Sequence, residues 1–233
     1  MLSLTENFDD PQVVAFVSDR SIDFSLNGKI FSLNAQQKNA LSLHTRIDME
    51  RVAWTRQVHG AQIISVDEDF LNSDSLCEAD GLLTRHLGVP IAIRTADCLP
   101  VFIFDRKQRV IGLVHAGWRG SHKRILGSAI ERMNNLWDTQ VQDIKIVFGP
   151  SIKSCCYQVG EEFQRYFPGE IRKKESGLYL DLTLVNCHQA LECGVRQENI
   201  FDSGICTCCD PKFFSYRREG KKAGRMISLM MLK

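Results

Sequence analysis

Two apolar runs separated by three polar residues constrain the fold more than any other feature of this chain. Residues 90–105 (PIAIRTADCLPVFIFD) and 109–118 (RVIGLVHAGW) are rich in β-branched and aromatic side chains, as buried strands are. The intervening RKQ is short and polar, which suits a tight turn between antiparallel strands. We therefore predict a buried β-hairpin near the middle of the sequence.

The register of this hairpin decides which side chains meet. If Asp105–Gln108 forms a four-residue loop, Phe104 lies opposite Arg109, and counting back places Cys98 opposite His115. Directly opposed side chains have Cβ atoms about 5 Å apart, a span that one metal ion can bridge. A slip of one residue would send the two side chains to opposite faces of the sheet.

Residue patterns in the rest of the sequence predict more strands than helices. Helices are expected at 121–137, with Ser121 as N-cap, and at 181–194, which opens with a capping Asp181 and closes with a glycine. Strand patterns occur at 13–18, 52–66 (strand, turn, strand), 144–152 and 224–232. With no repeat and no linker, we predict one domain over residues 1–233, of the α+β class with a mixed or antiparallel sheet.

Composition argues against several function classes. Hydrophobic residues make up 44% and charged residues 24%, and the net charge of +1 gives no electrostatic reason to expect nucleic acid or a membrane as partner. The N-terminus lacks the pattern of a secretory signal, and no apolar run is long enough to span a bilayer. The nine cysteines are then expected to be reduced thiols and metal ligands of a cytoplasmic protein.

A third candidate ligand joins the hairpin pair. His59, in QVHG, comes from a separate segment, and two imidazoles with one thiolate leave a fourth zinc position open, as catalytic sites do. Gly60 and Gly117 would let the backbone turn close to this site. The three residues lack short-range metal spacing, so two other interpretations stay open: a buried thiol beside a core histidine, or a Cys98 nucleophile with a histidine base.

A second group of cysteines stands elsewhere in the sequence. Cys206, Cys208 and Cys209, together with Cys155 and Cys156, could hold a structural metal. Neighbouring residues of a strand face opposite sides, so adjacent cysteines are poor ligands for one ion. Thiols that line a pocket are the favoured interpretation.

Arginines supply candidate anion-binding groups. Arg119 immediately precedes a predicted helix, whose N-terminus would attract an anion, and the Arg217–Arg218 pair is a second candidate because the guanidinium fork suits phosphate. Solvated surface arginines are the alternative. Trp118, Phe213, Phe214 and Tyr216 could stack on a base, although core packing is the default role for each.

Six motifs resemble one family. The chain carries, in order, RQVHG (56–60), ADGLLT (79–84), TADCLPVFIFD (95–105), GLVHAGWRG (112–120), GPSIKSCCYQVG (149–160) and FFSYRREGKKAGRMISL (213–229). This order is similar to that of the YfiH/YlmD family, whose members are also called multicopper polyphenol oxidase or laccase-domain proteins and purine nucleoside phosphorylases, with a peptidoglycan-editing branch. The resemblance covers about residues 52–232.

The resemblance implies a fold and a site. It implies a sheet-rich α+β domain flanked by helices, similar to the CNF-toxin/YfiH-like cysteine hydrolase fold, with zinc, or alternatively copper, held by His59, Cys98 and His115. We expect catalysis to involve Cys98, Asp97 and Arg119, and substrate binding to involve Gln57, Arg119 and Arg217. Asp97 is a candidate proton carrier, although its place beside Cys98 in a strand would turn it away from the metal.

The resemblance also implies activities. Family members are assigned phosphorolysis of adenosine, inosine and methylthioadenosine, and deamination of adenosine. A cysteine hydrolase that edits peptidoglycan precursors, a copper-dependent polyphenol oxidase and a non-enzymatic metal-binding module are the alternatives. Multicopper oxidation needs many histidines and this chain has six, so we favour the nucleoside activities, with a purine nucleoside and phosphate as partners of a monomer or small homo-oligomer.

Two segments depart from the family pattern. Residues 18–43 lack the paired glycines and the Asp-rich continuation usual there, and GKKAGR (220–225) stands where Thr-Gly-Arg is usual. If the first segment lines the substrate pocket, the choice of substrate will differ from that of better-known members.

Overall fold

The predicted hairpin lies at the centre of the molecule. β6 (Leu99–Asp105) and β7 (Val110–Ala116) pair antiparallel, and every residue of both strands is buried. The structure is a computed structural model that describes residues 1–25, 33–45, 52–71 and 77–233.

The hairpin register differs from the predicted one by two residues. Pro100 pairs with His115, so Cys98 is not directly opposite His115. The turn begins one residue later than expected because the Asp105 carboxylate accepts the backbone N–H groups of Lys107 and Gln108, at 2.8 and 3.1 Å, and so belongs to the strand end. A shift of two residues preserves the face, since strand side chains alternate with period two. Cys98, one residue before β6, therefore still approaches His115.

The hairpin forms the middle of the larger sheet, and a second sheet packs against it. The larger sheet is mixed, with parallel pairs at both edges, and its order is β12 (Ile200–Asp202), β8 (Ile144–Phe148), β6, β7, β4 (Gly81–Thr84), β3 (Ile63–Ser65). The second sheet is antiparallel, in the order β1 (Leu2–Ser3), β2 (Val13–Val17), β13 (Met226–Leu232), β5 (Ile91–Thr95).

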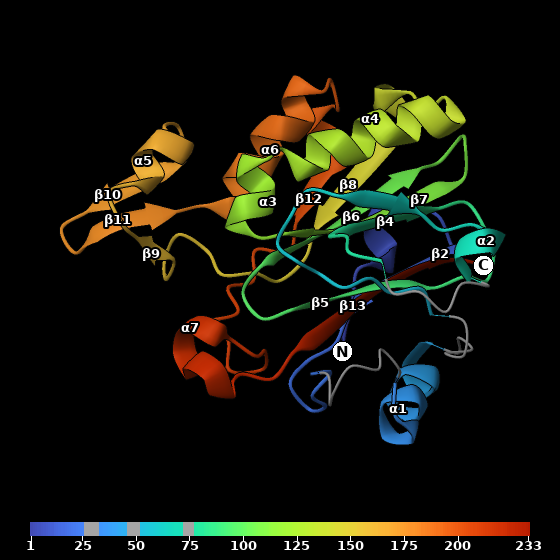
Figure 1. Cartoon of the computed structure of the whole chain (residues 1–233), viewed down its shortest axis with the longest axis horizontal. Helices are drawn as coiled ribbons and strands as arrows, with labels where there is room; N and C mark the ends of the chain where they lie inside the picture. Colours follow the sequence, from blue (N-terminus) through green and yellow to red (C-terminus); the bar gives the residue numbers. More distant parts are fainter. Residues whose placement is uncertain (26–32, 46–51, 72–76) are drawn as a thin grey trace.

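The sheets and helices form stacked layers. Phe102, Phe104 and Leu113 of the larger sheet pack against residues such as Ile93 and Met230 of the second sheet. The opposite face of the larger sheet is covered by α4 (Ile125–Trp137) and α6 (Leu182–Glu192), and the opposite face of the second sheet by α1 (Ala35–Thr45). Figure 1 shows these layers from top to bottom. Apolar surface is thus buried on both faces of both sheets, which explains the nearly continuous apolar runs in their strands.

The helix predicted at 121–137 is two helices. α3 (Trp118–His122) ends before Arg124, whose φ of +61° interrupts the helix, and α4 then begins. Ser121 is therefore no N-cap; it lies buried inside α3, where its hydroxyl accepts a hydrogen bond from Asn186. The capping aspartate of α6 is confirmed, because the Asp181 side chain accepts from the backbone N–H of Leu184.

Other parts of the chain complete the structure. Within 52–66, only β3 is a strand, while Ala53 and Arg56 form isolated bridges. A three-stranded sheet that no pattern predicted, β10 (Ile171–Lys174), β11 (Gly177–Leu180) and β9 (Gln158–Val159), projects to one side with α5 (Phe163–Tyr166) (Figure 1). The other helices in the described part of the chain are α2 (Glu68–Leu71), α7 (Tyr216–Glu219) and four short 3-10 helices, Thr5–Phe8, Val141–Asp143, Gln197–Asn199 and Gly220–Lys222.

The α+β prediction is confirmed by this mixture of sheets and separate helices. Among the described helices, none has the length and apolar character needed to cross a bilayer. Of the atypical segment 18–43, residues 26–32 lie outside the described residues.

Candidate metal centre and active site

Three segments bring two imidazoles and one thiol together. His59 lies in a loop, Cys98 just before β6 and His115 within β7, and one potential ligand atom from each lies within 4.8 Å of the other two. The two imidazole rings are 4.8 Å apart between centroids and nearly perpendicular. The structure thus assembles the three ligands predicted from the sequence, in a geometry that one metal ion can span.

A buried aspartate that the sequence analysis missed holds this arrangement. The Asp80 carboxylate accepts the backbone N–H groups of Val58, His59 and Gly60, at 3.2, 2.9 and 2.6 Å. His59 itself adopts a left-handed conformation with φ of +58°, which a non-glycine residue keeps only when its surroundings fix it. Asp80 therefore shapes the loop that presents the first ligand.

The same carboxylate orients the third ligand. Asp80 Oδ1 lies 2.8 Å from His115 Nδ1, and both side chains are buried. Because a carboxylate only accepts, Nδ1 carries the proton and Nε2 is the nitrogen available to a metal, the usual arrangement of a ligating histidine. Although burial alone would raise the pKa of Asp80, His115 and the N–H groups of Gly60 and Val58 lower it, so the carboxylate stays charged.

The thiol and imidazole stabilise each other's charge. Burial alone would raise the pKa of Cys98, but His115 and His59 lower it to about 6. Conversely, burial would lower the pKa of His115, whereas Cys98 and Asp80 raise it to about 9. Each group thus favours the charged form of the other, the thiolate and the imidazolium. A thiolate is the form that binds metal ions and attacks electrophiles.

Gly117 allows the backbone after β7 to pass close to the ligands. A Cβ atom at this position would lie 3.1 Å from Cys98 Sγ and 3.3 Å from the His59 ring. At Gly60 a Cβ atom would meet only ordinary contacts, the nearest at 3.4 Å, so its predicted importance for close approach is not supported by this geometry.

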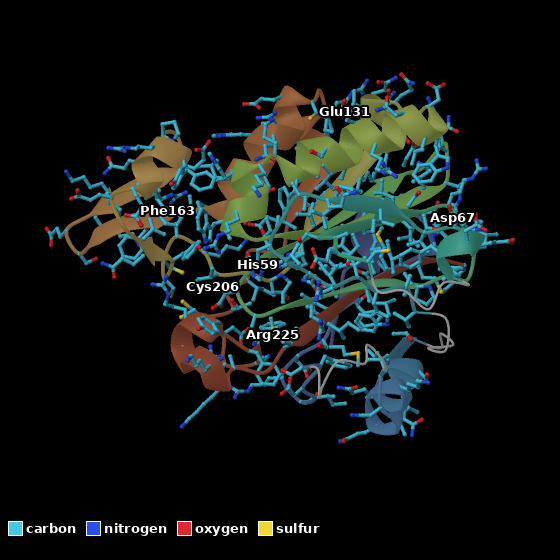
Figure 2. The ribbon with its side chains drawn as sticks, viewed as in Figure 1. His59, Asp67, Glu131, Phe163, Cys206 and Arg225 are labelled. Atoms are coloured by element: carbon cyan, nitrogen blue, oxygen red, sulfur yellow. The ribbon has the colours of Figure 1, made fainter. Side chains whose placement is uncertain are left out.

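The three candidate ligands line a cavity of about 750 Å³ that is also lined by several cationic side chains. Figure 2 labels two of its lining residues, His59 and Arg225. Asp97 is the carboxylate among its lining residues, and the cationic ones are Arg94, Arg119, Arg217, Lys221 and Arg225. Burial, and to a smaller extent the nearby Arg225, lower the pKa of Arg94 to about 10. Such a wall favours an anionic ligand, since the guanidinium fork binds phosphate oxygens. Arg94 and Arg225 were not predicted, because only the fold brings them here.

The predicted arginines have different environments. Arg119 lies inside α3 and not ahead of a helix, with its guanidinium 4.4 Å from the Trp118 ring centroid. The Arg217 guanidinium lies over Tyr157, 5.5 Å from the ring centroid, and donates to the Gln158 carbonyl. Arg218 is exposed to solvent and does not line the cavity; it donates to backbone carbonyls, among them that of Thr207 at 2.8 Å.

Asp97 and Gln57 line the cavity, but their side chains form hydrogen bonds with neighbouring protein groups. Asp97 lies in a bend with φ of +90°, and its two oxygens accept from the Thr207 hydroxyl and the Arg217 backbone N–H, both at 2.6 Å. The Gln57 amide donates to the Arg94 carbonyl and accepts from the Arg94 N–H. These contacts anchor two cationic residues of the wall.

The donor set suits zinc. Two imidazoles and a thiolate are among its preferred ligands, and three protein ligands leave a position open toward the cavity. Copper also binds such donors. Among the described residues, this is the one candidate metal group that contains histidine.

The fold and site define a class: an α+β protein whose layered sheets present a His–Cys–His centre at a cationic cavity. Residues 33–233 match the family described as multi-copper polyphenol oxidoreductase laccase. A purine nucleoside phosphorylase from Clostridium acetobutylicum is 34% identical over 213 residues, 89% of each chain. An adenosine deaminase from an unknown prokaryotic organism is 32% identical over 204 residues, 81% of this chain and 78% of the other.

Solved structures agree with the sequence relatives. Bacillus licheniformis YfiH superposes with a TM-score of 0.84 at 28% identity, covering 95% of this chain and 93% of that one. Geobacillus stearothermophilus YlmD gives 0.84 at 27% identity, with 96% and 93% covered. The chain belongs to this laccase-domain family, that of YfiH and YlmD.

Proposed function

We propose that this chain is a zinc-dependent purine nucleoside enzyme that cleaves adenosine, inosine and methylthioadenosine with phosphate and also deaminates adenosine. The observation that carries the proposal is the His59–Cys98–His115 centre at the mouth of a cation-lined cavity. The names of the two relatives described above support the substrate class.

Phosphorolysis needs an anion held beside a nucleoside. An oxygen of phosphate forms a bond to C1′ while the C1′–N9 bond breaks, the electron pair and a proton go to the purine, and ribose 1-phosphate results. We assign phosphate binding to Arg119 and Arg217, which both line the cavity. Their guanidinium groups can donate paired hydrogen bonds to the phosphate oxygens. Zinc at the centre would supply a Lewis acid and an activated water, which deamination of adenosine to inosine and ammonia requires.

Aromatic side chains offer a place for the base. Trp118 and Tyr157 line the cavity, and each already lies against a guanidinium group. Burial raises the pKa of Tyr157, so its hydroxyl stays protonated and can donate a hydrogen bond. We assign purine stacking to this wall.

The test is product analysis with zinc-loaded protein. Inosine should yield hypoxanthine and ribose 1-phosphate only when phosphate is present, and adenosine should also yield inosine. Cys98→Ala should abolish both reactions, whereas Cys187→Ala, which changes a thiol of α6 away from the cavity, should retain them. Base release that is independent of phosphate would contradict the phosphorolysis.

One observation favours a second candidate. The Cys98 thiolate, His115 and Asp80 have the order of nucleophile, base and orienting carboxylate found in cysteine hydrolases. The substrate would then be an amide, such as a peptidoglycan precursor. This function predicts activity that survives a chelator and is lost on thiol alkylation, the opposite of the zinc enzyme.

A further inference from the structure

A second group of thiols lies apart from the cavity. Cys155, Cys156, Cys206 and Cys209 each place a sulfur within 4.8 Å of the other three. Cys209 Sγ is 3.6 Å from Cys155 Sγ and 3.3 Å from Cys156 Sγ, and all four cysteines are free. Among the described cysteines only Cys98 lines the cavity, so these four thiols form a separate group.

The spacing fits one tetrahedral ion. Zinc–sulfur bonds of about 2.3 Å place the four sulfurs of a tetrahedral site about 3.8 Å apart. The two shortest contacts, 3.6 and 3.3 Å, lie slightly below this value and all four sulfurs lie within 4.8 Å of one another, so small side-chain rotations suffice. Cys206 and Cys209 also have the C-x-x-C spacing typical of zinc ligands, which the sequence analysis overlooked.

Turns explain why adjacent cysteines can share an ion. Residues 154–156 and 207–209 form turns, so the alternation of strand side chains does not apply to them. The two turns are joined by a backbone bridge between Ser151 and Cys206, with Thr207 N–H donating to the Ser151 carbonyl at 3.1 Å. The four sulfurs are therefore brought together by the backbone, before any metal binds.

The surroundings of Cys206 suit a thiolate. Lys153 N–H points at Cys206 Sγ, 3.5 Å away, and the N–H groups of Cys208 and Cys209 also face that sulfur. Arg218 donates to the carbonyl groups of Thr207 and Cys208 within the second turn. N–H···S contacts and nearby cations are what a zinc site with four thiolates, of net charge −2, requires.

We propose that Cys155, Cys156, Cys206 and Cys209 bind one structural zinc ion that ties together two loops of the cavity wall. On binding, each thiol releases its proton to solvent, and four protein ligands leave no open position. Tyr157 directly follows the first turn, and Thr207 in the second turn holds Asp97, which in turn binds the Arg217 backbone. The ion would therefore fix wall residues from outside the cavity (Figure 2, where Cys206 and His59 mark the two sites).

Metal content tests this directly. Full-length protein purified under reducing conditions, loaded with zinc and freed of excess should hold about two ions per chain. Cys206→Ser and Cys98→Ser should each remove one, and Cys208→Ser, between the two ligands in sequence, should remove none. Two ions lost in Cys98→Ser alone, or an unchanged count in a folded Cys206→Ser protein, would overturn the proposal.

A second measurement needs no substitution in the four-cysteine group, and so does not depend on whether such a variant folds. Cobalt(II) added to the wild-type chain should give intense thiolate-to-cobalt charge transfer, and most of it should persist in Cys98→Ser. A spectrum that disappears in Cys98→Ser, a Cys156–Cys209 disulfide in freshly purified protein, or an iron–sulfur chromophore would each contradict a single structural zinc. None of these readouts depends on nucleoside turnover, so this proposal and the proposed function fail independently.

Discussion

The two sulfur-containing sites of this molecule are built in different ways. The His59–Cys98–His115 centre mixes nitrogen and sulfur, rests on a buried hairpin and is oriented by the charged Asp80. The four-cysteine group is all sulfur, rests on two turns and is partly exposed, with backbone N–H groups as its neighbours. The first opens to the cavity and the second does not. From ligand number and placement we infer that the first is a site for chemistry and the second a site for stability.

The largest expected effect concerns the first site. Cys98→Ala should lower nucleoside phosphorolysis by about a thousandfold or more, because the metal and its charge stabilisation are lost together. Steady-state kinetics with inosine and phosphate measure this. Cys206→Ser should leave most of the turnover in the folded fraction; equal losses in the two variants would remove the distinction between the sites.

Two adjacent arginines give the next contrast. Arg217→Met should raise the KM for phosphate by about ten- to a hundredfold, the cost of one charged hydrogen bond. Arg218→Met should instead lower the melting temperature with little change in that KM, because its guanidinium donates to backbone carbonyls. If Arg218→Met alone raised the KM, the assignment of phosphate would be wrong.

Asp80 should affect only the first site. Asp80→Asn keeps the shape but loses the charge that orients His115, so zinc affinity at this site should fall about ten- to a hundredfold. Competition with a chromophoric chelator measures it. The affinity of the four-cysteine site should be unchanged, and a parallel fall there would indicate general unfolding.

A smaller effect is expected at the edge of the cavity wall. Asp23 accepts the backbone N–H groups of Arg225 and Ser25, and these lower its pKa although burial would raise it. A lowered carboxyl pKa stabilises the fold above the unfolded value of about 3.9, and this stability is lost as the pH falls through the folded value. Asp23→Asn should cost at most about 1 kcal/mol at pH 7 and less at pH 3, by urea unfolding. The same cost at both pH values would contradict this origin.

The sequence revealed much of the core because apolar runs mark buried strands, and it revealed the ligand set through the hairpin pairing and the family motifs. Nearly continuous apolar runs predicted the hairpin, and the Asp181 cap predicted α6. The register was wrong by two because the Asp105 side chain completes the turn, an effect that counting apolar residues cannot detect. The helix predicted at 121–137 is interrupted at Arg124, which adopts a left-handed conformation. Nothing in the sequence indicated this, because the position is not a glycine.

The site residues that sequence reasoning missed act through tertiary contacts. Asp80 looks like a turn residue before a strand, and only the folded chain shows that it serves both histidines. Arg94 lies near the end of β5 and Arg225 directly precedes β13, the strand paired with β5, although the two residues are far apart in sequence. The four cysteines were discounted because strand geometry was assumed where the chain turns.

Zinc titration into metal-free protein tests the central claim most directly, with bound metal and phosphate-dependent release of hypoxanthine from inosine followed together. We expect no activity without metal, and activity that rises in proportion to the zinc bound at the His59–Cys98–His115 centre. This zinc is the part of the total that is missing in Cys98→Ala. Full activity at zero zinc, or none when this site is filled, would contradict the account.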